Sequence, residues 1–278
     1  MTCYRLTPHI VEKPWGRDDI PANYGATHGQ RIGEVWFTGP ESLAQPLLVK
    51  YLFTSARLSI QVHPDDDQAQ ARGLAGGKSE CWYVLDTQGD ARLGIGLRRP
   101  IDTDRLRAAV IDGSIEELMD WKPVRSGSFY YIPAGTIHAI GGGLTLVEVQ
   151  QNNDVTYRLY DYGRPRELHL DDGLAVSRPE PYALPQQRVS SEASALLVDE
   201  QRAPFSLENL VSPAGETLRL GDGLCWFVPL LGRGLIDGQP WQAGECWLID
   251  SGADLSVEQA LHALLARPAP LDRRPQVG

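Results

Sequence analysis

A short pattern of aromatic and aliphatic residues occurs twice in the chain, and this repeat constrains the fold more than any other feature. The string ECWYV at 80–84 reappears as LCWFV at 224–228. Further along, a turn at 133–135 precedes the strand-like run of His138, and a similar turn at 250–252 precedes that of Leu255. Repetition of this kind predicts two related β units.

The two copies differ in length and in the polarity of two positions. In this alignment Glu80 matches Leu224, and His138 matches Leu255. Ligand-type residues of the first unit are therefore leucines in the second. A helical pattern near 102–120, split at Gly113, accounts for the extra length of the first unit. We expect a metal-free second unit that packs against the first.

The rest of the sequence favours short strands joined by turns. The chain has 28 Gly and 20 Pro in 278 residues, which is typical of many turns. We predict two strands within 46–62, a short helix near 65–72, a hairpin formed by 80–85 and 91–97, and strands at 127–133, 136–141 and 144–151. The predicted fold is mainly β, with a first unit at 1–178 and a second at 179–278.

Charge and composition narrow the choice of partners. The formal net charge of −10 would repel nucleic acid, and no long basic run offsets it locally. We find no apolar stretch long enough for a signal peptide or a membrane span. The four cysteines are widely spaced, without a CxxC pair, so we expect reduced packing residues. The sequence therefore predicts a cytoplasmic protein that is a monomer or a weak homo-oligomer and binds a small molecule.

Four polar residues have a pattern that suits a metal site. Gln61 and His63 are two apart in a predicted strand, so their side chains project from the same face. Glu80 opens the next strand, and His138 lies in a later one, so ligands from three strands could converge in a barrel. Two imidazoles, a carboxylate and an amide oxygen suit zinc, with iron, manganese, cobalt or nickel as substitutes. Taken singly, each residue is also explained by ordinary packing.

Cationic residues accompany this pattern. Lys78 is two residues before Glu80, Lys50 lies in the apolar run LLVKYLF, and Arg158 lies in TYRLYDYGR. A lysine flanked by apolar residues needs a favourable place for its ammonium group, such as a pocket that holds an anion, or it extends to the surface. We assign no role to the other histidines, which are His9, His28, His169 and His262.

The strings LSIQVHPDD, GKSECWYVL, YIPAGTIHAIGGGLTLVEVQQ and NDVTYRLYDYGR resemble the motifs of type I mannose-6-phosphate isomerases, in particular the short bacterial form. This resemblance implies a zinc enzyme of the cupin superfamily, with two jelly-roll β-barrel units. It places the metal ligands on Gln61, His63, Glu80 and His138. It also implies active-site roles for Lys78, Arg158, Glu148 and Asp154, and substrate contacts for Lys50 and Ser59.

The resemblance further implies the interconversion of mannose 6-phosphate and fructose 6-phosphate through a metal-stabilised cis-enediol. The chain lacks the large helical domain of the long enzymes of that family, so the pocket could be more open and less selective. Two alternatives stay open at this point: an iron-dependent cupin oxygenase that uses the same ligands, and a non-catalytic sugar-binding cupin.

Overall fold

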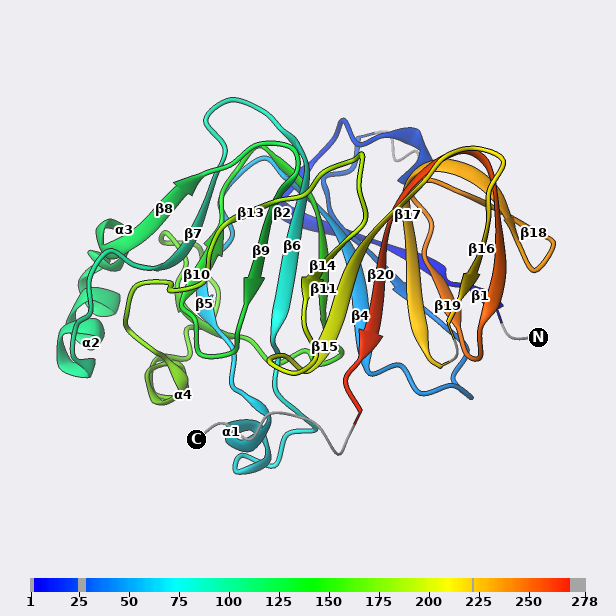
Figure 1. Cartoon of the computed structure of the whole chain (residues 1–278). Coiled ribbons are helices and arrows are strands. Elements are labelled where there is room, and N and C mark those ends of the chain that lie inside the picture. The colour runs from blue at the N-terminus through cyan, green and yellow to red at the C-terminus, as the bar shows by residue number, and fades with distance from the viewer. Residues whose placement is uncertain (1–2, 25–28, 222, 271–278) are drawn as a thin grey trace.

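The computed structural model describes residues 3–24, 29–221 and 223–270, and most of its regular secondary structure lies in three antiparallel β-sheets (Figure 1). The seven-stranded sheet has the order β13 (Gln187–Arg188), β9 (Ser128–Ile132), β6 (Glu80–Thr87), β11 (Leu144–Gln151), β4 (Leu47–Thr54), β3 (Ile32–Thr38) and β2 (Thr7–Arg17). The five-stranded sheet has the order β12 (Tyr157–Tyr160), β5 (Ile60–Val62), β10 (His138–Ile140), β7 (Arg92–Leu97) and β8 (Met119–Pro123). These two sheets make up the first unit, with the functional residues between them.

The eight-stranded sheet makes up the second unit. Its order is β1 (Cys3–Arg5), β19 (Trp247–Ile249), β17 (Cys225–Ile236), β20 (Ala253–Pro268), β15 (Phe205–Ser212) and β14 (Ala195–Val198), with β16 (Thr217–Leu220) on β20 and β18 (Gln239–Gln242) on β17. The long strand β17 pairs with β19, β18 and β20, and the long strand β20 pairs with β15, β16 and β17. The prediction of a mainly β fold with two jelly-roll units of the cupin type is confirmed.

Helices are few and belong to the first unit. They are η1 (Ala22–Tyr24), α1 (Asp66–Gln70), α2 (Thr103–Asp112), α3 (Ile115–Leu118) and α4 (Leu170–Val176). Asp65 caps α1 in a capping box with Gln68. Gly113 ends α2 in a left-handed conformation, so the predicted insertion and its break are confirmed. Helices α2, α3 and α4 lie at the end of the molecule opposite the eight-stranded sheet (Figure 1).

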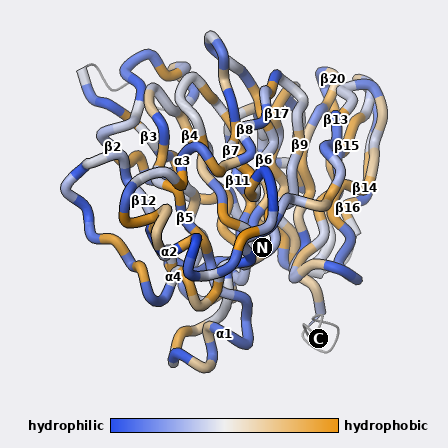
Figure 2. Tube along the Cα trace, turned by 90° about the vertical axis from the view of Figure 1, so that its left-hand side faces the viewer, coloured by the Kyte–Doolittle hydropathy of each residue, from blue (hydrophilic) through white to orange (hydrophobic). Residues whose placement is uncertain are grey.

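Apolar side chains form two core clusters in the first unit, one in the second unit and a fourth between the units. The shared core contains Phe53 and Val147 from the first unit and Phe205 and Trp226 from the second. Figure 2 shows that apolar segments concentrate along the interior strands, with polar segments along the outer loops. No helix in the described part of the chain is long and apolar enough to cross a bilayer.

The predicted hairpin of 80–85 and 91–97 is wrong. Strand β6 pairs with β9 and β11, whereas β7 pairs with β8 and β10 in the other sheet. The Gly-containing turn after β6 therefore carries the chain across the barrel and does not fold it back on itself. Strand β7 is buried on both faces beyond Arg92, so its sequence lacks the alternation of apolar and polar residues that would indicate its sheet.

The division into units at 178 and 179 stays a prediction, and two strands cross it. Strand β1 pairs with β19 of the second unit, and β13 pairs with β9 of the first. Each unit therefore takes a strand from the sequence range assigned to the other. The outermost ends of the predicted units, 1–2 and 271–278, lie outside the described residues.

Strand pairing gives the correspondence between the two units directly. His138 lies opposite Gln61 and Ile95, and Leu255 lies opposite Leu218 and Ile236 in the same arrangement. The predicted match of His138 with Leu255 therefore agrees with the pairing. By the same pairing, Gln61 corresponds to Leu218, and His63, two residues further along, corresponds to Leu220.

The match of Glu80 with Leu224 is wrong by one residue. Glu80 lies opposite Ile132, just before the first turn, and Cys225 lies opposite Ile249, just before the second. Side chains alternate along a strand, so a slip of one residue exchanges the two faces. The true counterpart of Glu80 is Cys225, which packs in the core of the second unit. All four predicted ligands thus have apolar counterparts.

Candidate metal centre and its cavity

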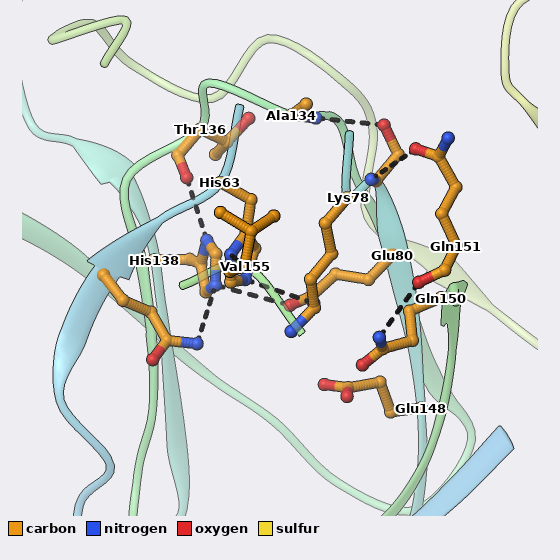
Figure 3. Close-up of polar contacts among 12 residues, drawn as sticks. His63, Lys78, Glu80, Ala134, Thr136, His138, Glu148, Gln150, Gln151 and Val155 are labelled. Atoms are coloured by element: carbon orange, nitrogen blue, oxygen red, sulfur yellow. Dashed lines mark hydrogen bonds and ion pairs between the residues drawn. The ribbon is translucent and has the colours of Figure 1, made fainter. Parts of the chain in front are cut away.

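Three side chains from three strands meet between the sheets of the first unit. His63 directly follows β5, Glu80 begins β6, and His138 begins β10. Each is only 1% exposed, and their ligand atoms lie within 4.8 Å of one another. The Nε2 atom of His63 is 3.4 Å from Oε2 of Glu80, and the Nε2 atom of His138 is 3.3 Å from Oε1 (Figure 3).

Backbone carbonyls fix the tautomer of both imidazoles. Nδ1 of His63 donates to the carbonyl of Val155 at 2.9 Å, and Nδ1 of His138 donates to the carbonyl of Thr136 at 2.8 Å. A carbonyl oxygen can only accept, so each neutral ring carries its proton on Nδ1 and presents a lone pair at Nε2. Outer hydrogen bonds of this kind orient histidines that bind metals.

Three of the four facing atoms have no hydrogen-bond partner in the described part of the chain. Nε2 of His63 and both carboxylate oxygens of Glu80 are buried without a hydrogen-bond partner. Burial, followed by the charge of Lys78, holds the pKa of His63 well below its usual value, so this ring is neutral at neutral pH. Two lone pairs aimed at one buried carboxylate repel unless a cation lies between them. The donor set therefore fits a divalent metal ion.

The predicted fourth ligand lies beside this triad. The amide Nε2 of Gln61 is 3.3 Å from Nε2 of His138, and Oγ of Ser59 donates to Oε1 of Gln61 at 3.1 Å. A half-turn of the amide exchanges nitrogen for oxygen at the same place. Such a turn would present an oxygen to a metal ion. The role of Gln61 as a ligand stays a prediction.

A polar cavity of about 390 Å³ opens next to the triad. Gln61 and Lys78 line it and also contact the triad, because Nζ of Lys78 is 3.8 Å from Oε2 of Glu80. Burial, followed by the charge of Lys50, lowers the pKa of Lys78. A lysine with a lowered pKa has more of its amine in the unprotonated form that can act as a base.

Strands of the seven-stranded sheet bring a second acid and base pair to the cavity. Nζ of Lys50 is 3.6 Å from Oε1 of Glu148, and the indole Nε1 of Trp82 donates to Oε2 of Glu148 at 3.0 Å. These three residues lie opposite one another on β4, β11 and β6. Burial lowers the pKa of Lys50, but nearby carboxylates, with Glu148 first, outweigh it and raise that pKa.

The structure brings all ten predicted site residues to one place. Seven of them line the cavity, namely Lys50, Ser59, Gln61, Lys78, Glu148, Asp154 and Arg158, and the other three form the triad. Arg158 lies opposite Gln61 across β12 and β5, and Gln61 lies opposite His138. Strands are about 4.8 Å apart, so roughly 10 Å of sheet separates Arg158 from His138 in this row.

Five further polar residues line the cavity and were missed from the sequence: Lys13, Glu34, Thr156, Arg166 and His169. Lys13 and Glu34 form an ion pair of 3.3 Å. They occur in the strings KPWG at 13–16 and GEVW at 33–36, which also resemble motifs of type I mannose-6-phosphate isomerases, and this resemblance was their sequence signal. His169, to which we assigned no role, accepts a hydrogen bond at Nδ1 from the backbone N–H of Arg158. His28 lies outside the described residues.

The fold and the triad define a cupin-like β protein with a buried site that fits a metal ion. Similar sequences include proteins named as mannose-6-phosphate isomerases. The chain is 36% identical to mannose-6-phosphate isomerase ManA of Bacillus subtilis (strain 168) over 192 residues, which cover 63% of this chain and 61% of that protein. It is 38% identical to mannose-6-phosphate isomerase of Streptococcus mutans over 152 residues, covering 51% and 48%. The chain thus spans about half the length of the curated relatives it matches, and no protein-family model matches.

Solved structures agree on the fold. Mannose 6-phosphate isomerase of Bacillus subtilis superposes with a TM-score of 0.74 at 22% identity, covering 96% of this chain and 100% of that one. Phosphomannose isomerase from Salmonella typhimurium also gives a TM-score of 0.74, at 15% identity, covering 97% and 100%. The chain has the fold of these isomerases, and its resemblance to mannose-6-phosphate isomerases in sequence is confirmed.

Proposed function

We propose that the chain is a metal-dependent aldose–ketose isomerase that interconverts mannose 6-phosphate and fructose 6-phosphate through a cis-enediol. The observation that carries this proposal is the buried triad of His63, Glu80 and His138, whose unpartnered atoms adjoin a polar cavity. The names of the relatives support the choice of substrate. We further propose zinc as the metal, a cytoplasmic location and a monomer or weak homo-oligomer.

His63, Glu80 and His138 would hold the metal, with Gln61 as a fourth ligand after its amide turns. When bound, a divalent metal supplies positive charge near the oxygen that becomes negative as a carbon acid ionises, and this is worth several kcal/mol. After the turn of the amide, the hydroxyl of Ser59, which now donates to Oε1 of Gln61, would accept from the amide nitrogen, so we propose that Ser59 orients this amide. A direct contact of Ser59 with substrate is a further part of the proposal.

The cavity offers two candidates for proton transfer between C2 and C1. Lys78 is buried and has a lowered pKa, so more of its amine is unprotonated and able to take a proton than in an ordinary lysine. Glu148 is the alternative base, and its carboxylate is oriented by Trp82 and Lys50. Asp154 would assist the opening of the sugar ring.

The remaining cations would bind the substrate. A guanidinium group such as that of Arg158 suits a phosphate because its N–H groups can donate to two oxygens at once. Lys50 forms an ion pair with Glu148, so we propose that Lys50 contacts the substrate while it stays paired with this carboxylate. The proposal predicts selectivity for a phosphorylated sugar.

A coupled assay of the zinc-loaded protein on mannose 6-phosphate, glucose 6-phosphate and mannose tests the proposal. We expect turnover of mannose 6-phosphate, loss of activity on chelation and recovery with zinc. Binding of mannose 6-phosphate without formation of fructose 6-phosphate would instead identify a sugar-binding protein. The names of the relatives do not favour a cupin oxygenase, and oxygen uptake in the same assay with iron would revive it.

The role of Lys78 has its own test. Lys78→Ala should lower kcat by about 100- to 10,000-fold, the usual range for one general acid or base, with the zinc content measured in parallel. Lys122→Ala is the control, because Lys122 forms its ion pair with Asp120 away from the cavity. A Lys78→Ala protein that binds zinc and turns over normally would leave Glu148 as the base.

A further inference from the structure

A returning segment of chain builds one side of the cavity. After β12 the chain turns at 161–164, where Tyr162 and Gly163 have positive φ angles of 54° and 77°, as in a type I′ turn. The N–H of His169 then donates to the carbonyl of Arg158 at 2.8 Å, and the N–H of Arg158 donates to Nδ1 of His169. The segment that follows the turn is thereby held beside β12.

A buried carboxylate in this turn holds two guanidinium groups. Asp161 is 2% exposed. It accepts two hydrogen bonds from Arg166, at 2.5 Å from Nε and 2.7 Å from Nη2, and one from Nη2 of Arg164 at 2.6 Å. Two parallel bonds fix the plane of the Arg166 guanidinium. Arg166 lines the cavity, whereas Arg164 is absent from its lining.

Arg158 and Arg166 bring positive charge to the same side of the cavity. Burial, followed by the charge of Arg166, lowers the pKa of Arg158, as two nearby cations require. Nη1 of Arg158 donates to the carbonyl of Glu167 at 2.7 Å, and its Nε is buried without a hydrogen-bond partner. A buried N–H group without a partner favours the binding of a hydrogen-bond acceptor.

The other cations of the cavity have carboxylate partners. Lys13 pairs with Glu34, Lys50 with Glu148, and Lys78 with Glu80. Arg158 is partly buried, but it forms no ion pair with a carboxylate in the part of the chain that the structure describes. Positive charge is therefore least compensated at the side of the cavity that Arg158 and Arg166 share, and an anion is favoured there.

We infer that Asp161 is a positioning residue that fixes Arg166 beside Arg158, and that these two guanidinium groups together bind the phosphate of the substrate. The pair thereby sets the preference for a phosphorylated sugar over the free sugar. This inference rests on the proposed function. Because Nδ1 of His169 accepts from the N–H of Arg158, the ring N–H of His169 is on Nε2 and adds a donor to the cavity that His169 lines.

Variants of the full zinc-loaded chain test the inference. Arg166→Ala should raise KM for mannose 6-phosphate by about 10- to 100-fold, the range for a lost hydrogen bond to a charged group. It should leave kcat, and kcat/KM for mannose, within about 3-fold. Arg164→Ala is the matched control, because it removes a guanidinium from the same carboxylate outside the cavity, and all constants should stay within about 3-fold.

The conservative change Asp161→Asn tests the positioning role. It keeps Arg166 but weakens the hold on its guanidinium, so KM for the phosphorylated sugar should rise less than in Arg166→Ala. A merely structural defect would lower kcat for both sugars together. If Asp161→Asn fails to fold, Arg166→Ala and Arg164→Ala still decide the matter, because equal KM values for these two variants would overturn the inference.

Binding of inorganic phosphate, measured by calorimetry, separates this inference from the proposed function. Arg166→Ala should weaken phosphate binding by about 10-fold or more, whether or not the protein turns over a sugar. Phosphate binding that depends on Arg166 without isomerase activity would support the anion site and contradict the proposed function. Isomerase activity with phosphate binding unchanged in Arg166→Ala would do the reverse.

Discussion

Glu80 has a buried carboxylate that the described residues around it leave without hydrogen bonds. Both of its oxygens are buried without hydrogen-bond donors, and two imidazole lone pairs face it. Among the described lysines and arginines, Lys78 forms the single ion pair with it, at 3.8 Å. Glu245 in the second unit is also buried, but it accepts from the indole of Trp247 at 2.9 Å and pairs with Arg5 at 2.7 Å. The two glutamates thus contrast a carboxylate that fits a metal with one satisfied by protein.

Glu80→Gln should weaken zinc binding by at least about 100-fold, because even groups one step removed from a metal typically contribute 10- to 100-fold. The rise in thermal stability on adding zinc should disappear with it. Thermal unfolding with and without zinc measures both effects, and Glu245→Gln, the control, should keep the rise. An unchanged zinc response in Glu80→Gln would remove this carboxylate from the metal centre.

A buried histidine in the second unit predicts a pH effect that is independent of the metal. Nε2 of His262 bonds to Oδ1 of Asn209 at 2.7 Å, and burial lowers the pKa of this ring. Between the lowered pKa and about 6.5, the unfolded chain therefore binds a proton that the folded chain does not. Stability contributed by the neutral ring is present above about pH 6.5 and is lost as pH falls below it.

This group should change the free energy of unfolding by at most about 1.4 kcal/mol per pH unit. Urea unfolding of the metal-free protein at pH 5 to 8 measures it, and His262→Gln should flatten the curve below pH 6.5 relative to the exposed-site variant His9→Gln. Identical curves for the two variants would assign the acid sensitivity to other groups.

At the scale of elements, strand pairing decides which residues face the cavity. The pattern of the sequence places β4, β5, β6, β10 and β11 nearly where the structure has them, because their alternating or continuous apolar residues are local signals. The predicted pairing of β6 with β7 was wrong, because a turn sequence does not reveal whether the chain folds back or crosses to the other sheet. The one-residue slip at Glu80 came from matching Cys81-Trp82 with Cys225-Trp226, which are identical in sequence but face opposite sides of their strands.

The break between α2 and α3 gives a prediction at this scale. Gly113 has a φ angle of +81°, and a Cβ there would lie 3.0 Å from the hydroxyl oxygen of Tyr160. Gly113→Ala should therefore lose about 1–2 kcal/mol for the left-handed backbone, plus a cost for displacing Tyr160. Gly89 has a φ angle of +64° and open space around it, so Gly89→Ala should lose only the backbone part. Chemical denaturation compares them, and equal losses would exclude a steric role for Tyr160.

At the scale of the whole molecule, the shared core joins the two units. Phe205, which is fully buried on β15, contacts the ring of Tyr131 edge-on at 6.0 Å between centroids. The exchange of β1 and β13 between the units adds backbone pairing to this packing. We therefore expect the units to unfold together.

Phe205→Ala should lower the free energy of unfolding by about 3–5 kcal/mol, the usual cost of emptying a large aromatic site, and zinc release should follow the same single transition as the loss of β structure. Phe227→Ala, which empties the core of the second unit alone, is the control for the volume removed. Two separate transitions for zinc release and β structure would show that the units are independent.

The sequence by itself determined the mainly β class, the helical insertion, the repeat and the ten residues of the candidate site, because strand periodicity, turn residues and motif strings are local. Only the tertiary structure decided that β6 and β7 belong to different sheets, that Cys225 is the counterpart of Glu80, and that Arg166 and His169 join the cavity. These facts depend on strand pairing and on a turn held by Asp161, and contacts between residues distant in the chain leave little trace in the sequence of any single segment.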